Sequence, residues 1–437
     1  MTKRKEKKTV SWEKRLLITN IEHQEKALLA GVYSSPRERW EAKDSLEELA
    51  SLAQTAGAVV WGSTVQFKEK RDPRFYIGKG KIMELAELCQ KEGINLVIFD
   101  EPLNPSQVRN IEEVLGQKVI DRTQLILDIF ARRARNKEGK LQVELAQLNY
   151  LLPRLAGKGL YLSQLGGGIG TRGPGETKLE FDRRKIKNRI AKVRQQIQRI
   201  AISRQQQRKR RESRLLPLVS LVGYTNAGKT TLFNLLTNSA APTSHNLFNT
   251  LDPLIRRLRL LDGQLCLLSD TVGFIHKLPH ELIVAFRATL DEVKKADLLI
   301  NVIDISDPNS YEQHKDVIKV LESLSITQRP IINVLNKTDL ITSALLPNRG
   351  RRIDNPIYMS ALTGEGKDAL LRRIVALLSE RRVAVTFEIP PADGRLRSLL
   401  HREGRVLREV YRGERMLLEA EVPRAMAQKY RRYLVGS

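Results

Sequence analysis

Apolar residues between positions 141 and 200 follow two helical stripes. The first has steps of 4, 3 and 4 and consists of Leu141, Leu145, Leu148 and Leu152. The second has steps of 4, 3, 4 and 3 and consists of Ile186, Ile190, Val193, Ile197 and Ile200. Such spacing is typical of a coiled-coil seam. Because one loop joins the stripes, we predict an antiparallel helical hairpin over residues 123–213.

The chain before this hairpin alternates between strand-like and helix-like patterns. Short apolar runs predict strands at residues 15–21, 56–65 and 94–103, and helical periodicity predicts helices at residues 45–54 and 81–93. We therefore expect an α/β subdomain over residues 15–122. Residues 1–14 are charged and have no apolar core behind them, so we interpret them as a basic flexible arm rather than a signal peptide.

Two more domains are predicted after the hairpin. Strands alternate with helices over residues 214–381, as a doubly wound, mostly parallel sheet requires. Residues 382–437 then follow the order strand, helix, strand, strand, helix, which predicts a small α+β domain. The predicted fold class of the chain is thus α/β, and the function of the last domain is not readable from its sequence.

The charge of the chain implies a polyanionic partner. Its 437 residues include 75 Lys and Arg against 50 Asp and Glu, a net charge of +25. Residues 131–215 alone hold 23 basic and 6 acidic residues, so the partner surface is expected to be local. Nucleic acid and anionic membrane both fit such a charge. A merely solvated hairpin is the alternative, although solubility needs only mixed charge.

Apolar runs and cysteines indicate the cellular compartment in which the protein is expected. The longest apolar run falls short of the roughly 18 residues that suggest a membrane span, so we expect no stable membrane insertion. Cys89 and Cys266 lie far apart without disulfide or metal spacing, which fits a reducing cytoplasm. We expect a cytoplasmic monomer and leave association with a membrane surface open.

An apolar strand before residue 223 leads into a phosphate-binding motif. Residues 223–230 read GYTNAGKT, which is GxxxxGK[ST] between a strand and a helix. Backbone N–H groups and the helix N-terminus wrap phosphates there. Lys229 is expected to neutralise the β- and γ-phosphates, and Thr230 to bind Mg²⁺ (magnesium). The predicted nucleotide-binding residues of this motif are Gly223, Tyr224, Thr225, Asn226, Ala227, Gly228, Lys229, Thr230 and Thr231.

Further motifs follow in the order that a GTPase requires. "DTVGF" ends an apolar strand, so Asp270 is expected to hold Mg²⁺ through water and the Gly273 N–H to meet the γ-phosphate. Thr250, in "FNTLDP", is the candidate switch threonine that meets Mg²⁺ and the γ-phosphate. The residues predicted to act in catalysis are Lys229, Thr250 and Gly273, and Thr271 and Val272 are predicted to border the nucleotide.

The last two motifs predict that the base is guanine. "NKTD" supplies Asn336, Lys337 and Asp339, and "SAL" supplies Ser360, Ala361 and Leu362. The Asp339 carboxylate can accept hydrogen bonds from guanine N1–H and N2–H₂, and the Ala361 N–H can donate to guanine O6. Adenine would leave the carboxylate unpaired at a cost of about 1–3 kcal/mol, enough to favour GTP over ATP.

A second glycine-rich segment, "QLGGGIGTRGPGETKLE" at residues 164–180, is not the nucleotide site. It has no preceding strand and no Lys-Ser/Thr pair that opens a helix. Its six glycines instead lie at the expected tip of the basic hairpin.

The chain resembles the HflX family of translational GTPases over nearly its whole length. The resemblance rests on residues 166–180, 223–234, 247–253 and 270–290 and on "NKTD". It implies an N-terminal subdomain, a helical hairpin, a GTPase domain and a C-terminal domain. It also implies binding to the large ribosomal subunit and its rRNA, and GTP-dependent separation of ribosomal subunits in stress or rescue. Leu254 departs from the threonine that usually follows "LDP" in the family.

The resemblance also suggests a role for the hairpin tip. Glycine lets the backbone approach closely, so the tip can enter a narrow space lined by RNA, toward the peptidyl-transferase region. The basic residues off the seam would follow phosphates. The candidate RNA-binding residues are Gly166, Gly167, Gly168, Gly170, Arg172, Gly173, Gly175, Arg183, Arg184 and Lys187.

The sequence lacks one side chain that many GTPases use in catalysis. Many GTPases place a glutamine after "DxxG" to orient the attacking water, but this chain has Phe274. Intrinsic hydrolysis is therefore expected to be slow, and two sources of activation stay open. The ribosome can order the switches, or a potassium ion (K⁺) can offset developing charge. Asn226 in "NAGKT" resembles the ion-binding asparagine of potassium-activated GTPases, or it only shapes the loop.

Two other functions remain as alternatives. The first is an RNA-binding GTPase switch that acts in RNA remodelling or decay outside translation, and the sequence does not separate it from a ribosomal factor. The second is a membrane-associated signalling GTPase, which is disfavoured because no lipidation motif or amphipathic anchor is evident.

Overall fold

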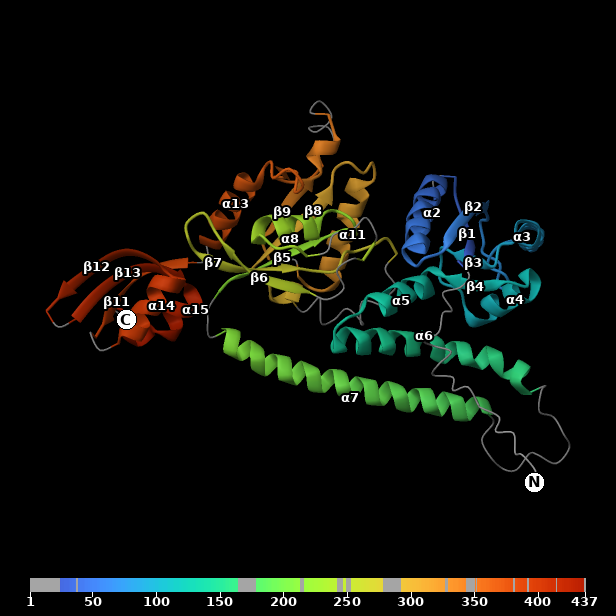
Figure 1. The fold of residues 1–437 in the computed structure, drawn as a ribbon, viewed down its shortest axis with the longest axis horizontal. Helices are drawn as coiled ribbons and strands as arrows, with labels where there is room; N and C mark the ends of the chain where they lie inside the picture. The colour runs from blue at the N-terminus through green and yellow to red at the C-terminus, as the bar shows by residue number, and fades with distance from the viewer. Residues whose placement is uncertain are drawn as a thin grey trace, which may run out of the picture. The chain divides into compact units, whose positions relative to one another are not determined.

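The chain divides into two compact units, Met1–Leu125 and Ile126–Ser437. The computed structural model (Figure 1) describes residues 24–36, 38–163, 178–212, 216–241, 247–248, 253–277, 292–326, 329–342, 350, 352–379, 382–390, 393–413 and 415–435. Within this division, the five domain limits predicted from the sequence stay a proposal.

The first unit contains a four-stranded parallel sheet in the order β2-β1-β3-β4. Its elements are β1 (Lys26–Tyr33), α2 (Glu38–Thr55), β2 (Val59–Phe67), α3 (Lys79–Glu92), β3 (Leu96–Phe99), α4 (Pro105–Leu115) and β4 (Lys118–Asp121). The predicted α/β character is confirmed, but β1, α4 and β4 were not predicted. β1 reads KALLAGVY, and its Ala and Leu residues favour a helix over a strand by intrinsic propensity. The strand predicted at residues 15–21 lies outside the described residues.

The second unit begins with helices. α5 (Arg122–Arg133) begins in the first unit and ends in the second. α6 (Lys137–Ser163) and α7 (Lys178–Glu212) follow, and these two helices run alongside each other in Figure 1. The predicted seam is confirmed: Leu141 and Leu148 of α6 are buried with Ile190 and Val193 of α7, and the other stripe residues pack against them. Arg183, Arg184 and Lys187 lie exposed off this seam.

A six-stranded sheet follows, in the order β10-β9-β8-β5-β7-β6. Only its edge strand β6 is antiparallel, and it pairs with β7. The elements are β5 (Leu218–Gly223), α8 (Lys229–Thr237), β6 (Leu254–Arg259), β7 (Leu265–Asp270), β8 (Leu298–Asp304), α11 (Ser310–Ser323), β9 (Ile331–Asn336), η1 (Thr338–Leu340), β10 (Ile357–Tyr358) and α13 (Lys367–Ser379). The predicted doubly wound, mostly parallel sheet is thus confirmed.

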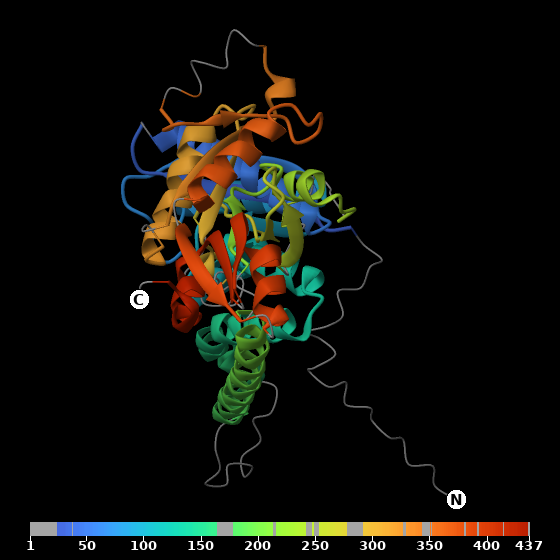
Figure 2. The same ribbon diagram turned by 90° about the vertical axis from the view of Figure 1, so that its left-hand side faces the viewer.

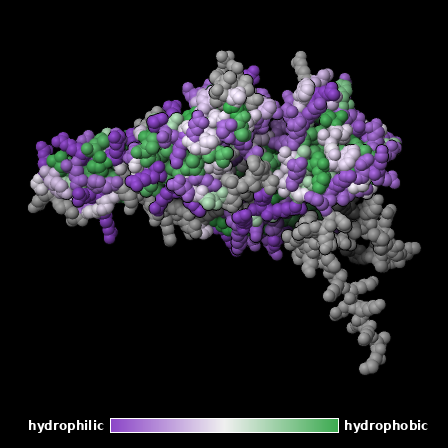
Figure 3. Space-filling view, turned by 45° about the horizontal axis from the view of Figure 1, so that its top comes forward, coloured by the Kyte–Doolittle hydropathy of each residue, from purple (hydrophilic) through white to green (hydrophobic). Residues whose placement is uncertain are grey.

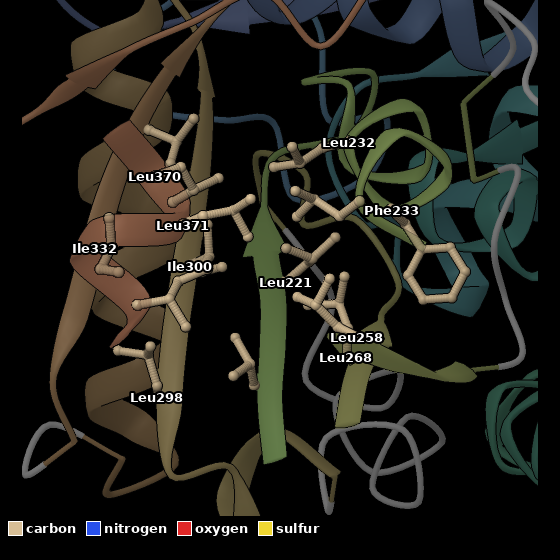
Figure 4. Packing of buried hydrophobic residues seen from close by; sticks show 14 of the residues in the cluster. Leu221, Leu232, Phe233, Leu258, Leu268, Leu298, Ile300, Ile332, Leu370 and Leu371 are labelled. Carbon is tan, nitrogen blue, oxygen red and sulfur yellow. The ribbon is translucent and has the colours of Figure 1, made fainter. Parts of the chain in front are cut away.

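Helices cover both faces of this sheet. On one face, Leu221 and Ile300 of the central strands pack with Phe233 of α8 and Leu370 of α13 (Figure 4). On the other face, Tyr311 of α11 packs against a smaller cluster of residues from β8, β9 and the chain before β10. Central strands buried on both faces need near-continuous apolar runs, which β5 and β8 have.

The chain ends in a three-stranded antiparallel sheet with two helices on one face (Figure 2). Its elements are β11 (Arg382–Ile389), α14 (Gly394–Glu403), β12 (Arg405–Arg412), β13 (Arg415–Pro423), α15 (Arg424–Lys429) and η2 (Arg431–Tyr433). Alternate residues such as Phe387 and Leu418 bury against Leu400 and Met426 of the helices. The predicted order of elements is confirmed.

Hydrophilic residues cover much of the face shown in Figure 3, and apolar residues gather there in smaller patches. Over the described part of the chain, every helix is too short or too polar to cross a lipid bilayer.

Candidate GTPase site

Three predicted motifs meet at one edge of the six-stranded sheet. The P-loop follows β5, Asp270 ends β7, and Asn336 ends β9. Because these strands are parallel, their carboxyl ends lie along the same edge, where α/β proteins bind ligands. The sheet therefore brings together residues that are far apart in sequence, as in the hydrogen bond between Asn336 and Ala227.

Asn336 ties three loops together. Its Nδ2 donates to the Ala227 carbonyl of the P-loop at 2.8 Å, and its Oδ1 accepts from the Ala361 N–H at 2.8 Å. Gly228 lies below this amide with φ 93°, and a Cβ there would stand 2.2 Å from Asn336 Nδ2. Glycine is therefore required at position 228. A bond from the Ala361 N–H to guanine O6 would have to share or replace its bond to Asn336.

The P-loop lysine is buried within the loop that it serves. Lys229 Nζ donates to the carbonyls of Tyr224 at 2.6 Å and Gly223 at 3.2 Å. Burial lowers the pKa of Lys229 to about 8, and the negative charge of Asp270 opposes this shift. Asn226, the candidate potassium ligand, is exposed in a left-handed conformation with φ 58°.

Thr230 and Asp270 form the pair predicted to hold magnesium. The Thr230 hydroxyl donates to Asp270 Oδ2 at 2.8 Å, and the Asp270 side chain is fully buried. A hydroxyl and a carboxylate are hard oxygen ligands of the kind that Mg²⁺ takes together with substrate phosphates. No group of three or more His, Cys, Asp or Glu that could hold a metal occurs among the described residues, so a dedicated cage is not seen there.

The segment after Asp270 pairs with the P-loop. The Phe274 N–H donates to the Gly223 carbonyl at 3.1 Å, and the Thr225 N–H donates to the Phe274 carbonyl at 2.8 Å. A Cβ on Gly273 would stand 2.8 Å from Thr225 Cα, so only glycine allows this approach. The side chain of Phe274 is buried, which removes it from any contact with water.

Two side chains that the sequence analysis did not single out extend this contact. The His276 N–H donates to the Tyr224 hydroxyl at 2.6 Å, and His276 Nδ1 lies 2.8 Å from Asp316 Oδ2 on α11. Burial raises the pKa of Asp316, but the hydrogen bonds and charges of His276 and Lys319 together outweigh it and hold the pKa below its ordinary value. No sequence pattern links Asp316 to this loop, because only the fold brings α11 beside it.

The other residues predicted to border the nucleotide differ in their solvent exposure. The Thr271 hydroxyl is buried and donates to the Leu221 carbonyl at 2.6 Å, and Val272 is buried beside it. Ser360 is buried, and its Oγ accepts from the Thr363 N–H at 3.2 Å. Thr231, on α8, is half-buried. Thr271 and Ser360 thus brace the loops through their side chains.

Two of the residues predicted to border the base are exposed. Asp339 is exposed on the short helix η1, and Leu362 is exposed in the loop after β10. Lys337 has a left-handed backbone and forms an ion pair with Asp304, a residue that sequence reasoning missed. Thr250 and the glycine-rich residues 166–175 lie outside the described residues.

Known proteins share these motifs and their order. A family model described as "50S ribosome-binding GTPase" matches residues 218–337. Models described as "GTP-binding GTPase N-terminal" and "GTP-binding GTPase Middle Region" match residues 43–131 and 133–211. GTPase HflX of Caldanaerobacter subterraneus subsp. tengcongensis is 46% identical over 412 residues, which is 94% of each chain. The chain belongs to the HflX family of GTPases.

Other relatives have similar coverage. GTPase HflX of Escherichia coli (strain K12) is 42% identical over 377 residues, 86% of this chain and 88% of that protein. A crystal structure of a GTP-binding protein from Sulfolobus solfataricus in complex with GDP is 26% identical and covers 82% of this chain and 99% of its own, with a TM-score of 0.43. Because the chain belongs to the HflX family by its curated relatives, the P-loop, "NKTD" and basic hairpin are parts of an HflX-family GTPase.

Proposed function

We propose that this HflX-family GTPase binds the large ribosomal subunit and uses GTP to separate ribosomal subunits in stress or rescue. The observation that carries the proposal is the hairpin of α6 and α7. The apolar stripes of the two helices pack together in the seam, and basic residues such as Arg183, Arg184 and Lys187 are exposed off it. A surface of one sign attached to a GTPase fold suits a phosphate-rich partner whose binding depends on the nucleotide.

The proposed nucleotide is GTP, and Asp339 is the residue proposed to select it. The carboxylate is exposed beside the P-loop edge, where it can accept from guanine N1–H and N2–H₂. Asn336 supports this reading, because it holds the P-loop and the loop of Ala361 in one place.

Magnesium is proposed to bind through Thr230 and Asp270, with Thr250 joining them from a segment outside the described residues. When bound, Mg²⁺ would offset the charge that develops on the phosphates. Lys229 would release the carbonyls of Gly223 and Tyr224 and turn its ammonium group to the β- and γ-phosphates. The Gly273 N–H would donate to the γ-phosphate.

Hydrolysis is proposed to need help from outside the chain. The Phe274 side chain is buried and apolar, so it cannot orient the attacking water. Ribosome-driven ordering of the switches and a potassium ion at Asn226 are the two proposed sources of activation.

Sedimentation with ribosomes tests the main proposal. The protein is mixed with 70S ribosomes in GDP or in a non-hydrolysable GTP analogue and separated on a sucrose gradient. We expect the protein to migrate with large subunits in the analogue, with a loss of 70S particles that GDP does not cause. Absence of the protein from ribosomal particles in both nucleotides would contradict the proposal and favour a function in RNA remodelling or decay.

A further inference from the structure

The ends of β8 and β9 bring an acidic side chain to the "NKTD" turn. The two strands are parallel, and their register pairs Asp304 with Asn336, the last residue of each strand. Lys337 follows at once, and its Nζ lies 2.5 Å from Asp304 Oδ2. The Asp304 side chain is 13% exposed and that of Lys337 24%, so the ion pair is largely shielded from water.

The carboxylate of Asp304 is itself held in place. Its Oδ1 accepts from the Ser306 N–H at 3.0 Å and from the Ser306 hydroxyl at 2.5 Å. Because this turn fixes one carboxylate oxygen, the other oxygen faces Lys337 in a set direction. The ammonium group of Lys337 therefore meets an acceptor that is positioned before any ligand binds.

Anchoring the ammonium group also fixes the rest of the lysine. The Lys337 backbone is held in the left-handed region, with φ 66° and ψ 36°, between Asn336 and η1. A free lysine stem samples many rotamers, but a stem tied at both ends follows one path. Lys337 and Asp339 are two residues apart in the "NKTD" turn. The methylene groups of an anchored lysine stem are an apolar strip that can cover the face of a flat heterocycle.

We propose that Asp304 is a positioning residue for guanine recognition. It holds Lys337 so that the lysine stem covers one face of the base while Asp339 reads the edge. The inference rests on the guanine site proposed above. Asp304 contacts neither phosphates nor magnesium in this scheme. Its substitution should therefore weaken binding of the base and leave binding of the phosphates unchanged.

Asp304→Asn tests the ion pair with Lys337 because it preserves the turn formed with Ser306. The amide oxygen can still accept both hydrogen bonds from Ser306, which places the amide NH₂, a donor, against the Lys337 ammonium group. Asp307→Asn is the matched control: Asp307 lies in the same turn, but it accepts from the Asn309 N–H at 2.8 Å and from Gln313 Nε2 at 2.7 Å.

Three quantities are measured on the full-length protein: release of a fluorescent GDP analogue, displacement of that analogue by inorganic pyrophosphate, and kcat at saturating GTP. For Asp304→Asn we expect GDP release to rise about tenfold, as for the loss of one charge-assisted hydrogen bond. The dissociation constant of pyrophosphate and kcat should not change. Asp304→Glu, which keeps the charge, should restore slow release in part, and Asp307→Asn should match the original protein.

Unchanged GDP release in Asp304→Asn would overturn the inference. So would equal weakening of GDP and pyrophosphate, because that result indicates general damage to the site. Asp339→Asn separates this inference from the proposed function. If Asp339→Asn weakens GDP and Asp304→Asn does not, the inference alone fails, and if neither variant matters, the proposed guanine site fails with it.

Discussion

The charge of a single buried lysine is expected to set the pH range of nucleotide binding. Burial lowers the pKa of Lys229 to about 8, and phosphates favour the protonated form. Affinity for GDP should therefore be full below the pKa and decline as pH rises above it, by up to about tenfold per pH unit. Titration of a fluorescent GDP analogue between about pH 7 and pH 9 measures this decline.

Lys229→Arg is the control for this pH dependence. A guanidinium group stays protonated throughout the range, so the profile of the variant should be flatter whatever its absolute affinity. Any decline of GDP affinity with pH that remains in Lys229→Arg comes from titration of the nucleotide itself. Parallel profiles for the two proteins would show that Lys229 does not titrate in this range.

The identity of one exposed carboxylate is expected to choose the base. Asp339→Asn keeps an acceptor for N1–H but presents a donor where guanine has its N2 amine. Affinity for GTP should fall about 10- to 100-fold, the cost of an unpaired donor, while affinity for xanthosine triphosphate should rise. Competition between the two nucleotides measures the change, and unchanged GTP affinity would refute the assignment of Asp339.

At the scale of elements, the residues that pack the two hairpin helices together differ from the residues proposed to bind the partner. The seam residues, such as Leu148 and Val193, are buried, whereas Arg183, Arg184 and Lys187 are exposed. A substitution on the basic face should therefore alter the partner interaction without loosening the two helices. The ion pair between Arg189 Nε and Glu144 Oε1 at 2.5 Å is partly exposed and adds little to this packing.

The triple substitution of Arg183, Arg184 and Lys187 by Ala tests the basic face. Each side chain that no longer neutralises a phosphate should lower the slope of log affinity against log salt by about 0.7–0.9. Ribosome binding should therefore weaken and depend less on salt, while GTP binding by the isolated protein should not change. Pelleting of ribosomes at several salt concentrations measures the slope.

A matched control removes exposed basic residues from the GTPase domain. Lys294, Arg372 and Arg373 are exposed there, and their replacement by Ala should leave ribosome binding nearly as it was. If the hairpin variant keeps the original affinity and salt slope, its basic face is only solvated.

At the scale of the whole molecule, activation is expected to come from partners that the chain lacks. Phe274 is buried and bonded to the P-loop through its backbone, so it supplies no group to the attacking water. Asn226 is exposed, with a left-handed backbone, and could reach an ion on the nucleotide. A cation there would offset the charge that develops between the β- and γ-phosphates.

The GTPase rate with ribosomes in potassium and in sodium, at matched ionic strength, tests this role. We expect the rate in potassium to be higher by roughly tenfold or more, as for other single groups that stabilise transition-state charge. Asn226→Ala should lose that difference while it keeps GTP binding. Equal rates in both salts would rule out the cation and leave ordering of the switches by the ribosome.

The sequence by itself determined the local parts of this protein. The hairpin seam, the strand–loop–helix of the P-loop and the order of elements in the last domain could be predicted, because each depends on residues that are close in sequence. β1 was not predicted because the Ala and Leu residues of its KALLAGVY sequence favour a helix, and only its pairing with β2 and β3 makes it a strand.

Only the tertiary structure decided which distant residues meet. Asp304 reaches Lys337 because two strands run parallel in register, and Asp316 reaches His276 because α11 packs beside the P-loop edge. Neither pair has a spacing that could be read along the chain. The physical reason is that a sheet aligns the ends of its strands in space, so side chains that follow different strands become neighbours whatever the length of chain between them.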